Sequence, residues 1–185
     1  MPAMADCPIA DDLSDGIQFT LAGGKETDVY RHGSRGVIEM YTTYADGLTE
    51  RTLLGEGVYM LEVVNTNDGQ PDPASRVTFD FQQPPQAMAN PKPHMRIKLD
   101  LETRVGTDAP TTQETLTVQW GAISEVTYGS CIYRRIPGTF QYEHSGNSAI
   151  LYRYFLPDLG ISVPFKIENG VNLFAIESIS ALGQK

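Results

Sequence analysis

The chain has 185 residues, a length that suits one domain or two small ones and is ample for a sizeable core. Its hydrophobic content of 41% is that of a globular protein and excludes general disorder. A net charge of −9 argues against nucleic acid and anionic lipid surfaces as partners, and no segment approaches about 18 consecutive apolar residues, so no membrane-spanning helix is predicted.

The N-terminus carries a pattern typical of export. Ala3-Met4-Ala5 is a small-x-small triplet of the kind that signal peptidase cleaves, so residues 1–5 are expected to be a signal-peptide remnant and residues 6–185 a single all-β domain. An even cysteine count in an exported chain favours a disulfide between Cys7 and Cys131; two free thiols in a cytosolic protein are the alternative. The protein is therefore expected to be periplasmic or secreted.

Helical sequence is scarce after this point, because only residues 7–13 favour a helix. From Ile17 to Ile179 apolar and polar residues alternate, as they do in strands that bury one face. The clearest strand is 95–105. Its predicted buried positions are Ile97, Leu99 and Leu101, and its predicted exposed positions are Arg96, Lys98, Asp100 and Glu102. Further strands are expected at 57–64, 77–81, 116–120, 150–156 and 161–167.

Turn and loop signals divide these strands. Asp46-Gly47, Gly146-Asn147 and Asn169-Gly170 are turn dipeptides, and Asn-Gly favours a type I′ hairpin most strongly. Pro164 indicates an edge strand or a bulge, and residues 82–93 form a proline-rich loop. The pattern predicts an all-β fold: a long antiparallel meander that forms an open or half β-barrel, with a two-sheet sandwich as the alternative.

No motif in the chain specifies a reaction. The three histidines lack the spacing of metal ligands, and no nucleophile elbow or nucleotide-binding glycine motif is present, so the sequence predicts no catalytic residue, metal or cofactor. Glu50 and Glu56, expected in neighbouring strands, are carboxylates of the kind that a glycosidase uses. A solvated acidic surface is the alternative interpretation of these residues.

Aromatic residues concentrate between Tyr128 and Phe155. Tyr142, Tyr152 and Tyr154 are predicted to line one ligand-binding sheet face, because Tyr152 and Tyr154 alternate on one strand and a turn folds Tyr142 back toward it. Ordinary core packing of the same rings is the alternative.

Residues 152–161, Tyr-Arg-Tyr-Phe-Leu-Pro-Asp-Leu-Gly-Ile, resemble a corner in uncharacterised exported bacterial β-meander proteins. The run of strands is similar to the half-barrel of the periplasmic lipoprotein carriers. The resemblance implies lipid handling but carries over no binding residue, and this chain lacks the helices that plug the carriers' concave face. We expect a non-enzymatic envelope protein that binds an apolar or amphipathic ligand, such as a lipid, or a protein partner, on its concave face. A hydrolase acting on a sugar or ester is the alternative.

Overall fold

The computed structural model describes residues 7–21, 24–167 and 176–183. Its helices are three short 3-10 turns, η1 (Ala10–Ser14), η2 (Pro73–Ser75) and η3 (Pro85–Ala87). The strands are β1 (Ile17–Leu21), β2 (Thr27–His32), β3 (Val37–Thr43), β4 (Thr49–Gly55), β5 (Tyr59–Asn67), β6 (Gln70–Pro71), β7 (Val77–Asp80), β8 (Arg96–Val105), β9 (Thr112–Trp120), β10 (Ser124–Tyr128), β11 (Cys131–His144), β12 (Asn147–Leu156), β13 (Ile161–Ile167) and β14 (Ile176–Ala181).

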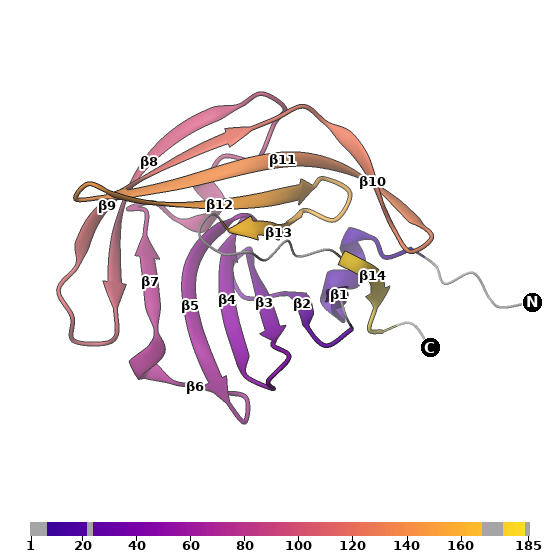
Figure 1. The fold of residues 1–185 in the computed structure, drawn as a ribbon, viewed down its shortest axis with the longest axis horizontal. Coiled ribbons are helices and arrows are strands. Elements are labelled where there is room, and N and C mark those ends of the chain that lie inside the picture. The colour runs from indigo at the N-terminus through magenta and orange to yellow at the C-terminus, as the bar shows by residue number, and fades with distance from the viewer. Residues whose placement is uncertain (1–6, 22–23, 168–175, 184–185) are drawn as a thin grey trace, which may run out of the picture.

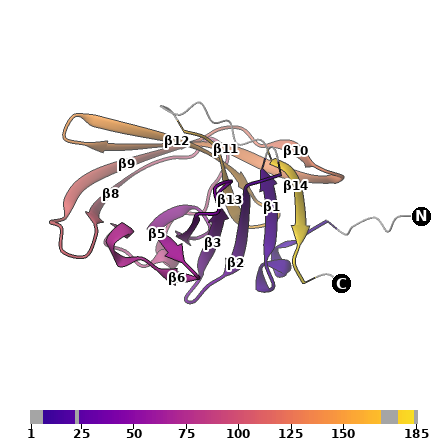
Figure 2. The ribbon, with the colours of Figure 1, turned by 60° about the horizontal axis from the view of Figure 1, so that its bottom comes forward.

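All of these strands belong to one antiparallel sheet. Its order is β13-β12-β11-β9-β8-β7-β5-β4-β3-β2-β1-β14, with β10 added to β11 and β6 to β5. The sheet curls so that β11 and β12 arch over β1 to β5 (Figures 1 and 2). Within the described ranges the edge strands β13 and β14 do not pair with each other, so the sheet is not closed. The predicted open meander of the half-barrel type is confirmed.

Contacts between the β13 edge of the sheet and the turn between the interior strands β4 and β5 hold the curl. The turn between β12 and β13 reaches the turn between β4 and β5, where the Ser162 amide donates to the Gly57 carbonyl at 2.8 Å. Gly57 has a φ of +65°, and a Cβ there would meet the Gly160 carbonyl oxygen. Glycine therefore permits both the backbone conformation and the close approach of the two turns.

The alternation predicted for 95–105 is present in β8. Leu101 is buried, with 1% of its surface exposed, whereas Arg96, Lys98 and Asp100 are exposed. Ile97 and Leu99, predicted to be buried, are half-buried, and Glu102, predicted to be exposed, is half-buried. The difference has a simple cause: β7 pairs only with positions 102–105 of β8, so the first half of β8 has a strand neighbour on one side alone.

The turn predicted at Gly146-Asn147 is present, shifted by one residue. The β11–β12 hairpin turns through Ser145 and Gly146, both at positive φ as a type I′ turn requires, one residue before the predicted dipeptide. Asn169-Gly170 lies outside the described residues, and the hairpin predicted there stays a prediction. The strands on either side of it, β13 and β14, pair with β12 and β1 respectively, at opposite edges of the sheet.

The register shift opposite Pro164 and the edge position of β13 confirm the prediction for that proline.

The core consists of two clusters. One is built on β1, β2, β3 and β13 around Phe19, Tyr30 and Ile161, and the other on β8, β9, β11 and β12 around Trp120 and Phe140. The proline-rich loop adds buried Met88 to the second cluster, and the Tyr59 hydroxyl donates to the Ala89 carbonyl of that loop at 2.7 Å. No helix in the described parts of the chain is long and apolar enough to cross a bilayer.

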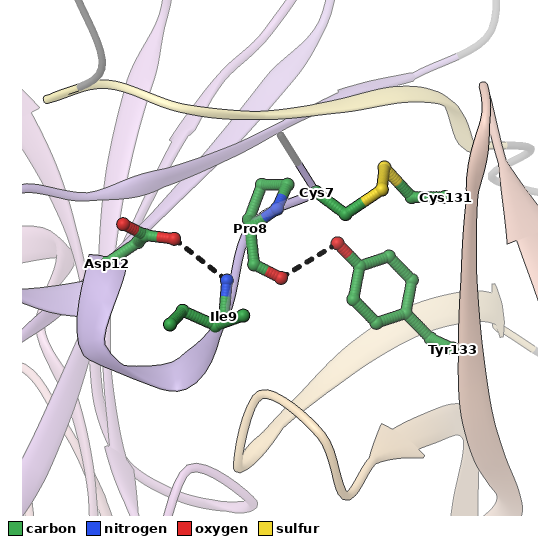
Figure 3. The surroundings of a disulfide bond; sticks show 6 residues. All are labelled: Cys7, Pro8, Ile9, Asp12, Cys131 and Tyr133. Atoms are coloured by element: carbon green, nitrogen blue, oxygen red, sulfur yellow. Dashed lines mark hydrogen bonds between the residues drawn. A yellow bond between two sulfur atoms is a disulfide. The ribbon is translucent and has the colours of Figure 1, made fainter. Parts of the chain in front are cut away.

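The predicted disulfide between Cys7 and Cys131 is confirmed, with the two Cα atoms 5.5 Å apart (Figure 3). The Tyr133 hydroxyl donates to the Pro8 carbonyl at 2.9 Å, and Leu13 of η1 is buried in the first core cluster. The bond and these contacts fasten the N-terminal segment to β11. The expected signal-peptide remnant at residues 1–5 lies outside the described residues.

Candidate ligand cavity

The curled sheet forms a partly open cavity of about 310 Å³ on its concave side. One wall comes from β1 to β5 with their adjoining turns, and the other comes from β12 and β13. A cavity of this size is at the lower end of the range, about 300–1,000 Å³, of pockets that bind small molecules. The lining residues are Leu21, Glu26, Asp28, Met40, Thr42, Tyr44, Glu50, Thr52, Met60, Val63, Leu151, Tyr152, Arg153 and Pro164.

A row of polar side chains crosses the first wall. Asp28, Thr42 and Glu50 lie directly opposite one another on β2, β3 and β4, so they share the concave face of the sheet. The Thr42 hydroxyl donates to the Asp28 carboxylate at 2.6 Å. Glu50 hydrogen-bonds with Tyr44 and Thr52. The strand register alone thus gathers two carboxyl groups and their donors at one end of the cavity.

Burial changes the acidity of this row. Asp28 is only 3% exposed, and desolvation raises the pKa of its carboxyl, although the Thr42 hydrogen bond and the charge of Arg153 lower it. Burial also raises the pKa of Glu50, against the hydrogen bonds from Tyr44 and Thr52, and the charge of Asp28 raises it further. Removing a carboxylate from water disfavours its charged form. A hydrogen-bond donor or a cation in the cavity would therefore stabilise the charged forms of Asp28 and Glu50.

Among the described lining residues, Arg153 contributes the only basic side chain. It is 4% exposed, and its Nη2 donates to the Ser162 carbonyl at 3.0 Å, an oxygen that also accepts from the Tyr30 hydroxyl at 3.3 Å. Its Nε is buried and has no hydrogen-bond partner within the described ranges. Nor does Arg153 form an ion pair with any residue that the structure describes, although its charge acts on Asp28.

Apolar side chains make up the rest of the lining. Met40 belongs to the first core cluster, Leu151 packs against the second, and Met60 packs against both. The cavity therefore lies where the two clusters meet. With Val63 and Pro164, these residues give it an apolar body next to the polar row.

Of the three tyrosines predicted to bind ligand, Tyr152 lines the cavity. Tyr142 is buried in the second core cluster, 8% exposed, with its ring 6.0 Å from that of Phe79. Tyr154 stacks on Phe165 at 3.9 Å and lies under the Arg135 guanidinium. The structure does not bring the three together, because Tyr152 pairs with Thr139, an odd number of residues from Tyr142, and side chains of a strand alternate between faces.

The acidic pair considered in the sequence is also divided. Glu50 faces the cavity, but Glu56 lies in the turn between β4 and β5, with a φ of +50°, and not in a neighbouring strand. His32, His94 and His144 are exposed. Within the described residues, no group of three or more histidine, cysteine or carboxylate side chains is placed to hold a metal ion.

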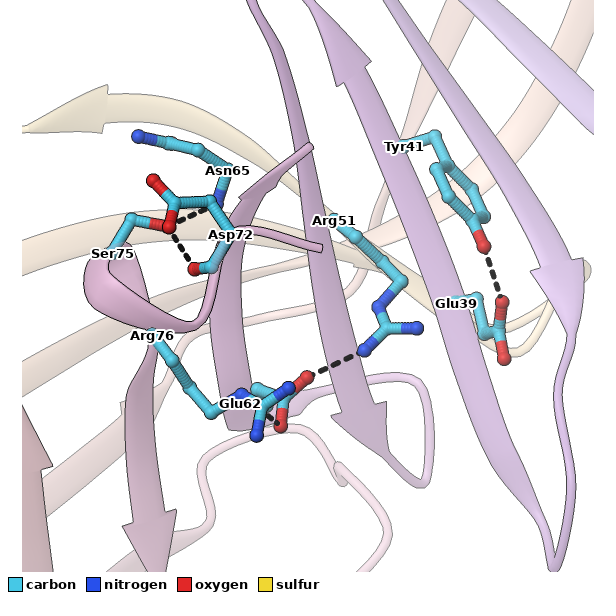
Figure 4. A network of polar contacts seen from close by, with 8 residues as sticks. All are labelled: Glu39, Tyr41, Arg51, Glu62, Asn65, Asp72, Ser75 and Arg76. Carbon is cyan, nitrogen blue, oxygen red and sulfur yellow. Dashed lines mark hydrogen bonds and ion pairs between the residues drawn. The ribbon is translucent and has the colours of Figure 1, made fainter. Parts of the chain in front are cut away.

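A second polar network lies on the opposite face of β3 to β5 (Figure 4). Arg51 and Arg76 both pair with Glu62, at 2.6 and 3.4 Å, and the Tyr41 hydroxyl donates to Glu39 at 2.8 Å. Tyr41 and Arg51 alternate with the cavity residues of the same strands. Partly exposed ion pairs of this kind contribute little to stability, about 0–1 kcal/mol each.

No family model matches the chain, and no curated protein matches it. Among solved structures, the chain is similar to the hypothetical lipoprotein YmcC from Escherichia coli K12. That similarity has a TM-score of 0.45 and 10% sequence identity, and it covers 96% of this chain and 88% of the other. We transfer no function and no residue from it.

Proposed function

We propose that the protein is a non-enzymatic envelope protein that binds a small amphipathic ligand in the cavity on its concave face. The observation that supports this most directly is the composition of the cavity. An apolar body formed by Met40, Met60 and Leu151 adjoins a polar end formed by Asp28 and Arg153. Ligand sites are typically apolar with a few polar groups that fix orientation.

The apolar body would hold a hydrocarbon chain. Transfer of such a chain out of water contributes about 0.8 kcal/mol per buried methylene. The polar end would receive a head group, since the Nε of Arg153 lacks an acceptor and the two carboxyl groups are poorly solvated. A purely structural cavity would need neither charged group.

An envelope location agrees with the disulfide. Disulfides persist in oxidising compartments and are rare in the cytosol. The bond between Cys7 and Cys131 therefore supports a periplasmic or secreted protein.

The test is to fill the cavity. Val63 lines it from β5, and Val63→Phe should occupy much of its apolar body. Val29 is the matched control: it follows Asp28 on β2, so Val29→Phe places the same ring on the opposite face. Native mass spectrometry with a neutral probe, monodecanoyl glycerol, should give a one-to-one complex with the parent protein and Val29→Phe but not with Val63→Phe. Equal binding to both variants would overturn the proposal.

One observation favours a second candidate, a hydrolase. Asp28 and Glu50 face one cavity, and burial raises both carboxyl pKa values, as a general acid requires. Turnover of ester or glycoside substrates that is abolished by both Asp28→Asn and Glu50→Gln would support the hydrolase instead of the non-enzymatic binding protein.

A further inference from the structure

The charges around the cavity are unbalanced. Three of its lining residues are acidic, namely Glu26, Asp28 and Glu50, and one, Arg153, is basic. The half-buried Glu50 and the buried Asp28 lie on the strands on either side of Thr42. The charge of Asp28 makes Glu50 harder to ionise, and the charge of Glu26 does the same to Asp28. The polar end of the cavity is therefore a region of negative potential.

The single guanidinium does not offset all of this charge. Arg153 acts on Asp28 and is held by the Ser162 carbonyl through Nη2. Neither Glu26 nor Glu50 forms an ion pair with a residue that the structure describes. Carboxylates shielded from water are stabilised by an opposite charge nearby. Among the residues that the structure describes, no basic side chain pairs with either of these two carboxylates.

A second observation independently indicates a ligand. The side chain of Arg153 is almost wholly buried against the cavity, yet its Nε has no acceptor among the described residues. Buried donors without a partner are rare in native structures because each costs about 1–3 kcal/mol. An oxygen of a bound molecule would satisfy it.

We infer that the ligand is an amphiphile with a cationic amine head group, whose ammonium lies beside Glu50 and Glu26 and whose chain lies among Met40, Met60 and Leu151. This inference rests on the proposed function and adds the sign of the head group. A neutral oxygen next to the amine would accept from Arg153 Nε. An anionic head group, such as a fatty-acid carboxylate, would be repelled by three carboxylates. The one guanidinium nearby, that of Arg153, already donates to the Ser162 carbonyl and acts on the charge of Asp28.

The experiment compares three probes of equal chain length on the full, oxidised chain: decylamine, decanol and decanoate. Isothermal titration calorimetry near neutral pH should give decylamine an affinity at least about tenfold above that of decanol, which corresponds to about 1.4 kcal/mol. Decanoate should bind more weakly than decanol. Val63→Phe should abolish binding of decylamine, which separates cavity binding from attraction to the acidic surface.

Glu50→Gln removes one charge and keeps the shape of the side chain. It should lower decylamine affinity about tenfold or more, while decanol affinity changes by less than about twofold. Glu39→Gln is the matched control, because Glu39 lies on β3 on the face away from the cavity, with Tyr41. It should leave all three affinities unchanged, and Glu26→Gln provides a second cavity variant should Glu50→Gln fail to fold.

The outcomes separate the two proposals. Tightest binding of decanoate, or unchanged decylamine affinity in folded Glu50→Gln and Glu26→Gln, would overturn the inference. Equal binding of all three probes would also overturn the inference of a cationic head group, while leaving the proposed ligand-binding function in place. Failure of all three probes to bind would refute both.

Discussion

Removal of the disulfide between Cys7 and Cys131 should lower the free energy of unfolding by about 5 kcal/mol. The bond joins residues separated by 124 positions. For a loop of that length the chain-entropy relation gives a loss of about 16 cal/mol/K, or about 4.9 kcal/mol at 25 °C. The effect should be large for a second reason, since the bond fastens the segment that carries Leu13 into the core and Pro8 against Tyr133.

The assay is urea unfolding followed by the fluorescence of Trp120, the single tryptophan of the chain. It compares the oxidised protein, the reduced protein and the Cys7→Ser/Cys131→Ser variant, and the last two should agree. Tyr133→Phe removes only the hydrogen bond to Pro8 and should cost about 0.5–1.5 kcal/mol. A loss below about 1 kcal/mol in the double variant would refute the reasoning, because the bond would then restrict an N-terminal segment that contributes little to the fold.

Two further predictions concern the curl of the sheet and its buried charge. Gly57→Ala should destabilise the protein by more than about 1 kcal/mol, because its φ is positive and the new Cβ meets a carbonyl of the facing turn. Gly47→Ala is the control: its φ is also positive, but no atom lies near its Cβ. It should lower the free energy of unfolding by less than Gly57→Ala does in the same urea assay. Asp28→Asn should raise stability near neutral pH and lose that advantage as the pH falls below 3.8, the ordinary pKa of the carboxyl. Burial raises the pKa of the folded carboxyl, so the unfolded chain loses its proton first and stability falls as the pH rises through the interval between the two pKa values. Urea midpoints measured across that interval check the sign, and a variant that is no more stable at neutral pH would contradict it.

Local patterns in the sequence were sufficient for the strands and for several of their details. The alternation of apolar and polar residues identified the core face of β8, because only one face of the sheet is buried there. Pro164 indicated the edge strand and the register shift because proline cannot donate to a ladder. The pairing of Cys7 with Cys131 followed from the even number of cysteines together with the export-like triplet Ala3-Met4-Ala5.

Long-range arrangement was not accessible in the same way. No local signal indicates that β14, near the end of the chain, pairs with β1 near its start. The cavity row was missed because Asp28, Thr42 and Glu50 meet only through the register of three strands. One signal was available: Arg153 is the single charged residue in the otherwise apolar and aromatic run 150–156.

The concave face departs from what stability alone would favour, and this supports a binding role for it. A buried arginine and a buried aspartate that are not in direct contact contribute less than apolar residues of similar size, since their desolvation is not offset by a close ion pair. An unfilled space beside Met60 and Leu151 forfeits packing contacts as well. The opposite face of the same strands has neither feature, because Arg51 and Glu62 are in contact there at 2.6 Å. On the concave face, a ligand with an apolar chain, a cationic head group and a neighbouring neutral oxygen would fill the space, offset the carboxylate charge and accept from Arg153 Nε.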